Sequence, residues 1–415
     1  MHHRPSLLVV LGGCTAMLGI VRTADMPSIS AIVTTHHLRG SYLAHATIWR
    51  DPGPLSSADV RDGPHGAFPD ALERAANGAG IRCTFVTPGI ELSGRSAKFL
   101  CRADDGQSLR FKYWDPLREA GNREVFATVA ATRLMWALGF NAVPGLAMNV
   151  LCEDCPESPM TGQGARGARR YLALLQFQLN EPVIVSGHDL DQGWSWRELD
   201  DAIAALPPGE ERIRQRTHFD ALTLLGVLLQ HGDRKPEQQA VYCDAPVDST
   251  LGEIRPGPDT DGAMWLLERA PIPACTRAAV VIVDVGATFG GAGRLSRETT
   301  SKMNLEQGRK RPVFVHTDTD ACRGNLTASI AAGDDGESDP IISEQGRRFL
   351  VEQMHRLTTD HVRALFEAAR VDQFVDGRRA NASAASNPQS VDAWVNAFED
   401  KIHQIESRTC HRAPQ

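Results

Sequence analysis

A polar octapeptide, residues 231–238, directly follows a long helical pattern of apolar residues, and it limits the folds open to this chain. It reads His-Gly-Asp-Arg-Lys-Pro-Glu-Gln. About fifty residues later an apolar run, residues 280–283, ends at Asp284, and Gly286 follows. An ionised aspartate at the end of an apolar strand is costly to bury unless a cation, such as a metal ion, pairs with it. A helix, a polar loop and a buried strand in this order indicate a mixed α+β chain.

The composition excludes some classes of protein. The chain has 415 residues, of which 42% are hydrophobic and 23% charged, so it can bury a full core without relying on disulfides. The net charge is −7, no basic stripe is present, and the aromatic residues, 6% of the total, are scattered. These features argue against a nucleic-acid partner. Beyond the N-terminus no segment reaches the roughly 18 continuous apolar residues of a membrane span.

The N-terminus has the pattern of an export signal. Arg4 precedes an apolar stretch over residues 7–21, and we expect residues 1–24 to be a signal peptide. Cys14 ends a Leu-Gly-Gly-Cys sequence that resembles a bacterial lipobox, so lipidation of Cys14 is one expectation and plain signal cleavage is the other. A start codon assigned too far upstream is the alternative to export. The expected location is periplasmic, extracellular or lipid-anchored, with membrane contact only through this anchor.

The cysteines agree with export. An even number remains after Cys14 is set aside, which predicts disulfides in an exported chain. These residues are Cys83, Cys101, Cys152, Cys155, Cys243, Cys275, Cys322 and Cys410. Cys152 and Cys155 fit a zinc half-site, a redox pair or a local disulfide. A zinc site needs a second pair of ligands, which is not evident, and a redox pair would begin a helix, whereas Pro156 indicates a loop. A local disulfide is therefore favoured.

The periodicity of the chain predicts four parts after the signal. Residues 25–80 are rich in Pro, Gly, Asp and His and are expected to form an irregular extension. Residues 81–180 favour strands around one helix, and residues 181–375 favour mostly helices. The expected strands are 81–87, 97–102, 109–113, 146–151, 171–179, 240–243 and 278–283. The expected helices are 122–138, with one apolar face, 196–205, 210–229, 343–357, 359–369 and 391–407. An exposed insertion is expected at 244–273, and residues 376–415 are expected to form a linker and the last helix.

Polar residues of the octapeptide match the needs of phosphoryl transfer, which requires cations at the phosphates, a carboxylate at the attacking hydroxyl, and oxygen ligands for Mg²⁺ or Mn²⁺. Asp233 is the candidate base, and Lys235 is a point charge for a γ-phosphate. Gln238 and Asp284 are candidate metal ligands. The alternatives are an inert Lys-Pro turn for the loop and an ordinary strand-ending turn for Asp284.

A second group of polar residues lies in the expected strands of residues 81–180. Lys112 stands at the centre of a strand, where a lone charge needs a partner or a ligand, and Glu124 begins the next helix. Lys98, on the neighbouring strand, is a rival for the same role. Gly94 and Ser96 lie at the preceding turn, whose backbone N–H groups are candidates for covering phosphates. The alternative for Lys112 is an edge-strand side chain that faces water.

The octapeptide and the Asp284-x-Gly-x-x-Phe-Gly segment together resemble the atypical branch of the protein-kinase-like superfamily. That branch includes the secreted Golgi casein kinases, the HipA-like bacterial kinases and the phosphatidylinositol kinases. The resemblance implies an α+β, bilobal protein-kinase-like fold, with a β-rich N-lobe over 81–180 and a mostly helical C-lobe over 181–375. The chain departs from the protein-kinase pattern in two ways. Gln238 stands in place of the usual asparagine, and the turn with Gly94 and Ser96 is not a glycine-rich GxGxxG loop.

The resemblance also implies roles for the candidate residues. Asp233 would be the catalytic base, Gln238 and Asp284 the metal ligands, and Lys112 with Glu124 the pair that anchors ATP. The implied function is an exported ATP-dependent kinase that uses Mg²⁺ or Mn²⁺ and acts on a protein or small-molecule acceptor. An inactive kinase-fold binding module and an AMP-transferring enzyme are the alternatives. Because the strands on either side of the insertion pair in kinase folds, a disulfide between their cysteines, 243 and 275, is also expected.

Overall fold

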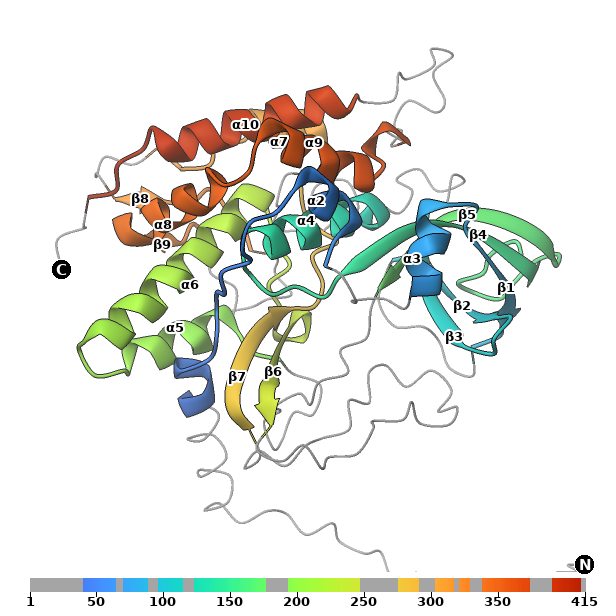
Figure 1. The fold of residues 1–415 in the computed structure, drawn as a ribbon, viewed down its shortest axis with the longest axis horizontal. Coiled ribbons are helices and arrows are strands. Elements are labelled where there is room, and N and C mark those ends of the chain that lie inside the picture. The colour runs from blue at the N-terminus through green and yellow to red at the C-terminus, as the bar shows by residue number, and fades with distance from the viewer. Residues whose placement is uncertain are drawn as a thin grey trace, which may run out of the picture.

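The computed structural model describes residues 40–64, 70–88, 96–114, 123–176, 193–246, 275–290, 303–316, 321–328, 338–373 and 390–411. The expected signal peptide with Cys14, the turn residue Gly94, most of the insertion and most of the linker lie outside these residues. The described part is a mixed α+β structure, as expected. Figure 1 shows a small barrel of strands on one side and a group of helices on the other. Among the described residues no helix combines the length and the apolar character needed to span a membrane.

Five strands close into a barrel in the order β1-β2-β3-β5-β4. They are β1 (Ile81–Val86), β2 (Lys98–Ala103), β3 (Ser108–Tyr113), β4 (Gly145–Cys155) and β5 (Gly167–Gln176). β1 pairs with β2 antiparallel and with β4 parallel, and this parallel pairing closes the barrel. Side chains alternate between the two faces of a strand, so Phe99, Phe111 and Tyr113 fill the interior while Lys98 and Lys112 share the outer face. β5 begins at Gly167, four residues before the start of the expected strand 171–179, and ends at Gln176.

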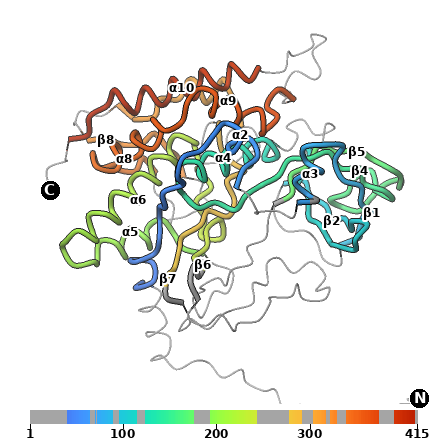
Figure 2. Tube along the Cα trace, viewed as in Figure 1, coloured from blue at the N-terminus to red at the C-terminus, as the bar shows by residue number. Residues whose placement is uncertain are grey.

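The helix after β3 is α4 (Glu124–Ala137), and it lies between the barrel and the other helices (Figure 2). It was expected to have one apolar face, but every described residue in it except Trp136 is buried. The reason is that α4 has neighbours on several sides: strands β3, β4 and β5, and helices from both ends of the chain. A helix surrounded in this way is mostly apolar all round, and Glu124 at its start and Arg133 near its end are buried charged exceptions.

In the segment expected to be irregular, the described residues include a helical turn at 40–44 and two further helices, α2 (Ser57–Asp62) and α3 (Asp70–Asn77). α2 begins with a capping box in which Ser56 and Asp59 bind each other's backbone N–H groups. α2 packs against α4 and against α9 (Thr359–Ala368), and α3 packs against β1 and β4. The segment is therefore part of the folded body rather than an appendage.

The helical side of the molecule is built around α6, which buries its apolar residues against its neighbours. Its helices are α5 (Trp196–Ala204), α6 (Glu210–Leu229), α7 (Leu305–Lys310), α8 (Glu344–Met354), α9 and α10 (Val391–Glu406). Two short sheets accompany them: β6 (Gln239–Pro246) with β7 (Cys275–Ile282), and β8 (Cys322–Arg323) with β9 (Ile341–Ile342). The helix α7 was not expected from the sequence, because a helix this short leaves no periodic pattern.

Three disulfides are described. Cys83 binds Cys101, Cys322 binds Cys410, and Cys152 binds Cys155. Cys152 and Cys155 are both fully buried, so the interpretation of this pair as a local disulfide is confirmed. The expected disulfide across the insertion stays a prediction, since the side chains at 243 and 275 lie outside the described part. The backbone pairing of β6 with β7 sets position 243 opposite Ala278 and position 275 opposite Pro246.

Candidate active site

The octapeptide is held by a buried arginine beneath it. α6 ends at Leu229, and Gln230 adopts the left-handed conformation that turns the chain. Arg234 is fully buried: its guanidinium carbon lies 3.9 Å from the centre of the Trp196 ring, and its Nε donates to the carbonyl of His231. A Cβ atom at position 226 would lie 2.5 Å from this guanidinium, which explains the glycine there. Arg234 therefore fixes the loop and does not reach the site.

The loop that Arg234 holds presents the side chain of Asp233 at the site. Its side chain is about one third exposed, and Lys235 Nζ lies 3.6 Å from Asp233 Oδ1. Burial raises the pKa of Asp233, and the negative charges of Asp284 and Glu124 raise it further, while Lys235 opposes them. The loop thus places a carboxylate with increased basicity near two other carboxylates.

Gln238 links the octapeptide to the strand that ends at Asp284. The backbone carbonyl of Gln238 accepts from the N–H groups of Val283, at 2.7 Å, and Asp284, at 3.3 Å. Asp284 Oδ1 accepts from the N–H of Gly286 at 2.9 Å, a local turn that orients the carboxylate. The two candidate metal ligands are therefore adjacent, although they stand 46 positions apart in the sequence.

Lys112 joins three separate segments at one point. Its Nζ lies 2.8 Å from Glu124 Oε2 on α4 and 2.8 Å from Asp284 Oδ2 after β7. Burial alone would lower the pKa of Lys112, but Asp284 and Glu124 outweigh it and raise that pKa. Burial alone would raise the pKa of Asp284. The positive charge of Lys112 outweighs burial, with help from the Gly286 N–H and from Lys98, so the pKa of Asp284 is lowered. Lys112 and Asp284 are therefore both charged at neutral pH.

The contact between Lys112 and Asp284 depends on a close approach of the segment after Asp284 to α4. A Cβ atom at Gly286 would lie 2.7 Å from Glu124 Cγ, so only glycine lets the segment after Asp284 lie against α4. On the other side Ser96 Oγ donates to Glu124 Oε1. Ser96 is thus at the site, and its neighbour Gly94 lies outside the described residues. The contact between Lys112 and Glu124 is the one that the resemblance implies, and the nucleotide-anchoring role of the pair stays a prediction.

Lys98, the rival of Lys112, is not remote from the cluster. It lies directly opposite Lys112 in the pairing of β2 with β3, and both side chains are buried. Burial lowers the pKa of Lys98 to about 8, with Arg110 and Lys112 adding to the effect. Arg110 was not singled out from the sequence. Its position two residues before Lys112 in a strand, hence on the same face, was the available signal.

The arrangement brings carboxylates of Asp233, Glu124 and Asp284 together with the cations Lys98, Lys112 and Lys235. Across the described ranges no cluster of three or more His, Cys, Asp or Glu side chains has the geometry of a metal site. A metal ion here would therefore take at most a few ligands from the protein, and the rest from a bound anion and water. That pattern is usual for Mg²⁺ at nucleotide sites.

Comparison with known proteins adds little. No protein-family model matches the chain, and no curated protein matches it. Among solved structures, it is similar to a proinflammatory kinase, CtkA, from Helicobacter pylori, with 10% sequence identity and a TM-score of 0.36. The alignment covers 78% of this chain and 92% of that chain. A similarity this low carries no argument about activity.

Proposed function

We propose that this chain is an exported, ATP-dependent phosphotransferase of the protein-kinase-like type, acting with Mg²⁺ or Mn²⁺. The observation that carries the proposal is the bridge made by Lys112. One lysine contacts a helix carboxylate, Glu124, and a strand-end carboxylate, Asp284, and the loop of Asp233 lies beside them. These are the parts that phosphoryl transfer needs from a protein.

The arrangement of a strand barrel beside a group of helices supports a bilobal fold. The closed barrel and α4 fall within the expected N-lobe, residues 81–180, and helices α5 to α9 fall within the expected C-lobe, residues 181–375. The candidate residues come from both parts: Lys112 and Glu124 from the first, Asp233, Lys235, Gln238 and Asp284 from the second. A nucleotide bound at their junction would contact both.

The donor set fits a hard divalent cation. Asp284 offers a carboxylate whose lowered pKa keeps it ionised, and Gln238 offers an amide oxygen, both of which suit Mg²⁺ or Mn²⁺. When bound, the metal ion would neutralise charge on the β- and γ-phosphates. Lys112 would keep Glu124 as its partner and donate to phosphate oxygens. Ser96 would hold the far oxygen of Glu124 in place.

Asp233 would orient the acceptor hydroxyl. In the transfer, the acceptor oxygen forms a bond to the γ-phosphorus, the bond from that phosphorus to the bridging oxygen breaks, and ADP leaves. The hydroxyl proton passes to Asp233, whose raised pKa makes it the better proton acceptor. Lys235 stands 3.6 Å from Asp233 and is available to the γ-phosphoryl group during transfer.

Two other activities use the same residues. An AMP-transferring enzyme would place the α-phosphorus, rather than the γ-phosphorus, at Asp233. A binding module without catalysis would keep the fold alone, and the intact set of Lys112, Asp233 and Asp284 favours an active enzyme over it. Export is supported by the three described disulfides, which persist in oxidising compartments. A lipid anchor at Cys14 belongs to the same proposal.

The first experiment is a thermal-shift titration of residues 25–415 with ATP, with and without Mg²⁺ or Mn²⁺. We expect metal-dependent stabilisation in the parent, retained in Asp104→Asn and lost in Asp284→Asn. Asp104 is a matched control because it is an exposed aspartate in the turn between β2 and β3. No shift with any nucleotide would overturn the proposal in favour of the binding module. The mass of a modified acceptor then separates phosphate transfer from AMP transfer.

A further inference from the structure

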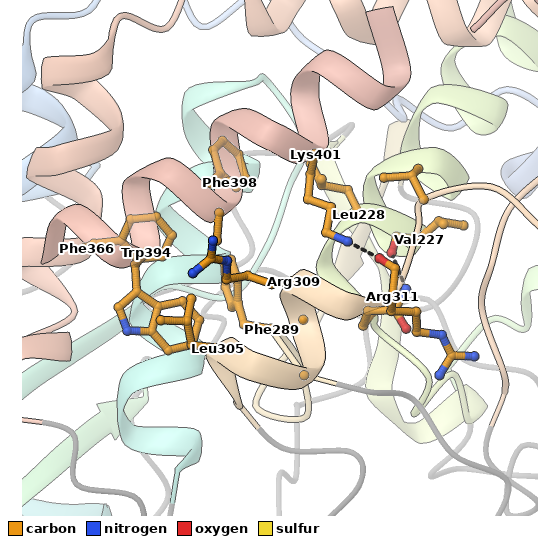
Figure 3. Close-up of a pocket in the computed structure, with 15 residues that line it drawn as sticks. Val227, Leu228, Phe289, Leu305, Arg309, Arg311, Phe366, Trp394, Phe398 and Lys401 are labelled. Carbon is orange, nitrogen blue, oxygen red and sulfur yellow. Dashed lines mark hydrogen bonds between the residues drawn. The ribbon is translucent and has the colours of Figure 1, made fainter. Parts of the chain in front are cut away.

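A cavity of about 40 Å³ lies among α6, α7, α9, α10 and the segment that follows Asp284 (Figure 3). None of the candidate catalytic, nucleotide-binding or metal-binding residues lines it. One wall is aromatic, formed by Phe289, Phe366, Trp394 and Phe398. Their rings contact one another edge to face or tilted, with centroids 5.8 to 6.5 Å apart. The other walls are largely aliphatic.

The charged residues that line the cavity are all cations: Arg309, Arg311 and Lys401. Among its described lining residues none is acidic. Arg311 directs its guanidinium away, to Asn325 Oδ1 at 3.1 Å and Thr327 Oγ1 at 3.0 Å. Arg309 is exposed at the rim, and Figure 3 shows it reaching toward Trp394 and Phe398. The polar end of the cavity is therefore set by Lys401.

Lys401 is a buried ammonium group with few polar neighbours. Its side chain is 9% exposed, and its Nζ donates to the backbone carbonyl of Arg311. Burial lowers the pKa of Lys401 to about 8. The positive charge of Arg311 lowers this pKa further, and the negative charge of Asp400 opposes the decrease. An ammonium group has three N–H donors, and one carbonyl accepts from only one of them. A buried cation beside an open space, with no carboxylate in the walls, matches an anionic head group.

The walls of the cavity are held in place before any ligand arrives. The disulfide from Cys322 to Cys410 ties the end of α10 to β8. Gln404 Oε1 accepts from the N–H of Val313, and Arg347 donates to the carbonyl of Ile405 at 3.0 Å. A preformed site loses little affinity to ordering on binding.

We propose that this cavity is a binding site for a short-chain carboxylate, whose head group accepts from Lys401 Nζ and whose alkyl chain lies against the aromatic wall. A space of about 40 Å³ holds roughly three water molecules, which suits a chain of two to four carbons. Phe289 and Gly290, which line the site, belong to the same segment as Asp284, so the ligand contacts the backbone that carries the candidate metal ligand.

The test is a thermal-shift titration of the chain, residues 25–415, with sodium formate, acetate, propionate, butyrate and hexanoate, against sodium chloride at equal ionic strength. We expect stabilisation that rises with chain length up to propionate or butyrate and falls at hexanoate. Equal responses to all the salts, or the same response to inorganic phosphate as to propionate, would overturn the proposal.

Variants locate the effect. Lys401→Met keeps the apolar stem and removes the charge, and we expect about tenfold weaker propionate binding or worse, the usual loss for a hydrogen bond to a charged group. Lys310→Met, an exposed lysine of α7 paired with Glu306, is the matched control and should bind as the parent does. Ala397→Leu fills the space while keeping Lys401, and should abolish binding. Parent-like binding in both Lys401→Met and Ala397→Leu would overturn the assignment.

Discussion

At the scale of single residues, the site depends on charges that compensate one another under burial. Lys112 is 9% exposed and Glu124 is 11% exposed, so neither is stable without its partner. Taking one partner away leaves the other charge buried, and this costs more than the intact pair contributes. The resemblance pointed to Lys112 and Glu124, but the sequence alone did not decide between Lys112 and Lys98, since both stand in strands of one hairpin.

Replacing Lys112 by methionine is expected to lower the free energy of unfolding by about 3 kcal/mol, because Glu124 and Asp284 lose their shared cation. Lys98→Met is the matched control on the facing strand, and it should cost much less, because burial already disfavours the charge of Lys98. Urea unfolding of the two variants measures the difference. Equal losses would contradict the special position of Lys112.

His231, the first residue of the octapeptide, should make the protein sensitive to acid. Burial lowers the pKa of His231 to about 3, with Arg234 adding to the effect, whereas an unfolded histidine titrates near 6.5. Between these values the unfolded chain binds a proton and the folded chain does not, so stability falls as pH drops from about 6.5 to 3. His231→Phe should flatten this part of the profile. An unchanged slope in equilibrium unfolding would refute the assignment.

At the scale of elements, Gly286 sets how closely the segment after β7 approaches α4. The segment after Asp284 lies against α4 because Gly286 has no side chain, and this contact holds the carboxylate of Asp284 within reach of Lys112. In the sequence, Gly286 stands out only as the glycine that follows the strand end at Asp284. Its packing role was not predictable, since the sequence does not show which helix the segment meets.

Gly286→Ala should separate α4 from this segment and reduce nucleotide affinity as well as stability, the latter by about 1 to 3 kcal/mol as for other overpacked contacts. Gly167→Ala is the control, because a Cβ atom there meets nothing within 4 Å. Thermal unfolding with and without ATP and metal measures both effects. If Gly286→Ala leaves both the stability and the nucleotide affinity unchanged, Glu124 moves aside at little cost.

Elements with strong local signals were predictable, and elements defined by distant contacts were not. The bounds of α6 match the expected helix 210–229, and α8 begins at Glu344, next to the start of the expected helix 343–357. The closed barrel was not foreseen, because the pairing of β1 with β4 joins residues that leave no local pattern. The two short helices of the N-terminal segment gain their stability from packing on the body, which composition does not reveal.

At the scale of the whole molecule, the described disulfides differ in how much chain they enclose. Cys322 and Cys410 are separated by 88 positions, and Cys152 and Cys155 by three. The chain-entropy relation gives roughly 4.6 kcal/mol for the larger loop and roughly 1.6 kcal/mol for the smaller one. The larger one also fixes α10 on the helical side of the molecule.

Replacing both Cys322 and Cys410 by alanine should therefore lower the free energy of unfolding by more than the same change at Cys152 and Cys155. Chemical denaturation of the two double variants under oxidising conditions measures this, and the parent under reducing conditions should lose more than the sum of both, because the disulfide from Cys83 to Cys101 is reduced as well. A larger loss from the small loop would show that strand geometry, rather than loop size, governs these bonds.

The bridge at Lys112 also bears on the order in which ligands arrive. In the protein alone the ammonium group lies 2.8 Å from Asp284 Oδ2. Under the proposed function, a free metal ion would compete with this ammonium group for the carboxylate, whereas a nucleotide carrying its own metal ion would offer the lysine phosphate oxygens in exchange. The site would then bind the metal–nucleotide complex in preference to unaccompanied Mg²⁺ or Mn²⁺.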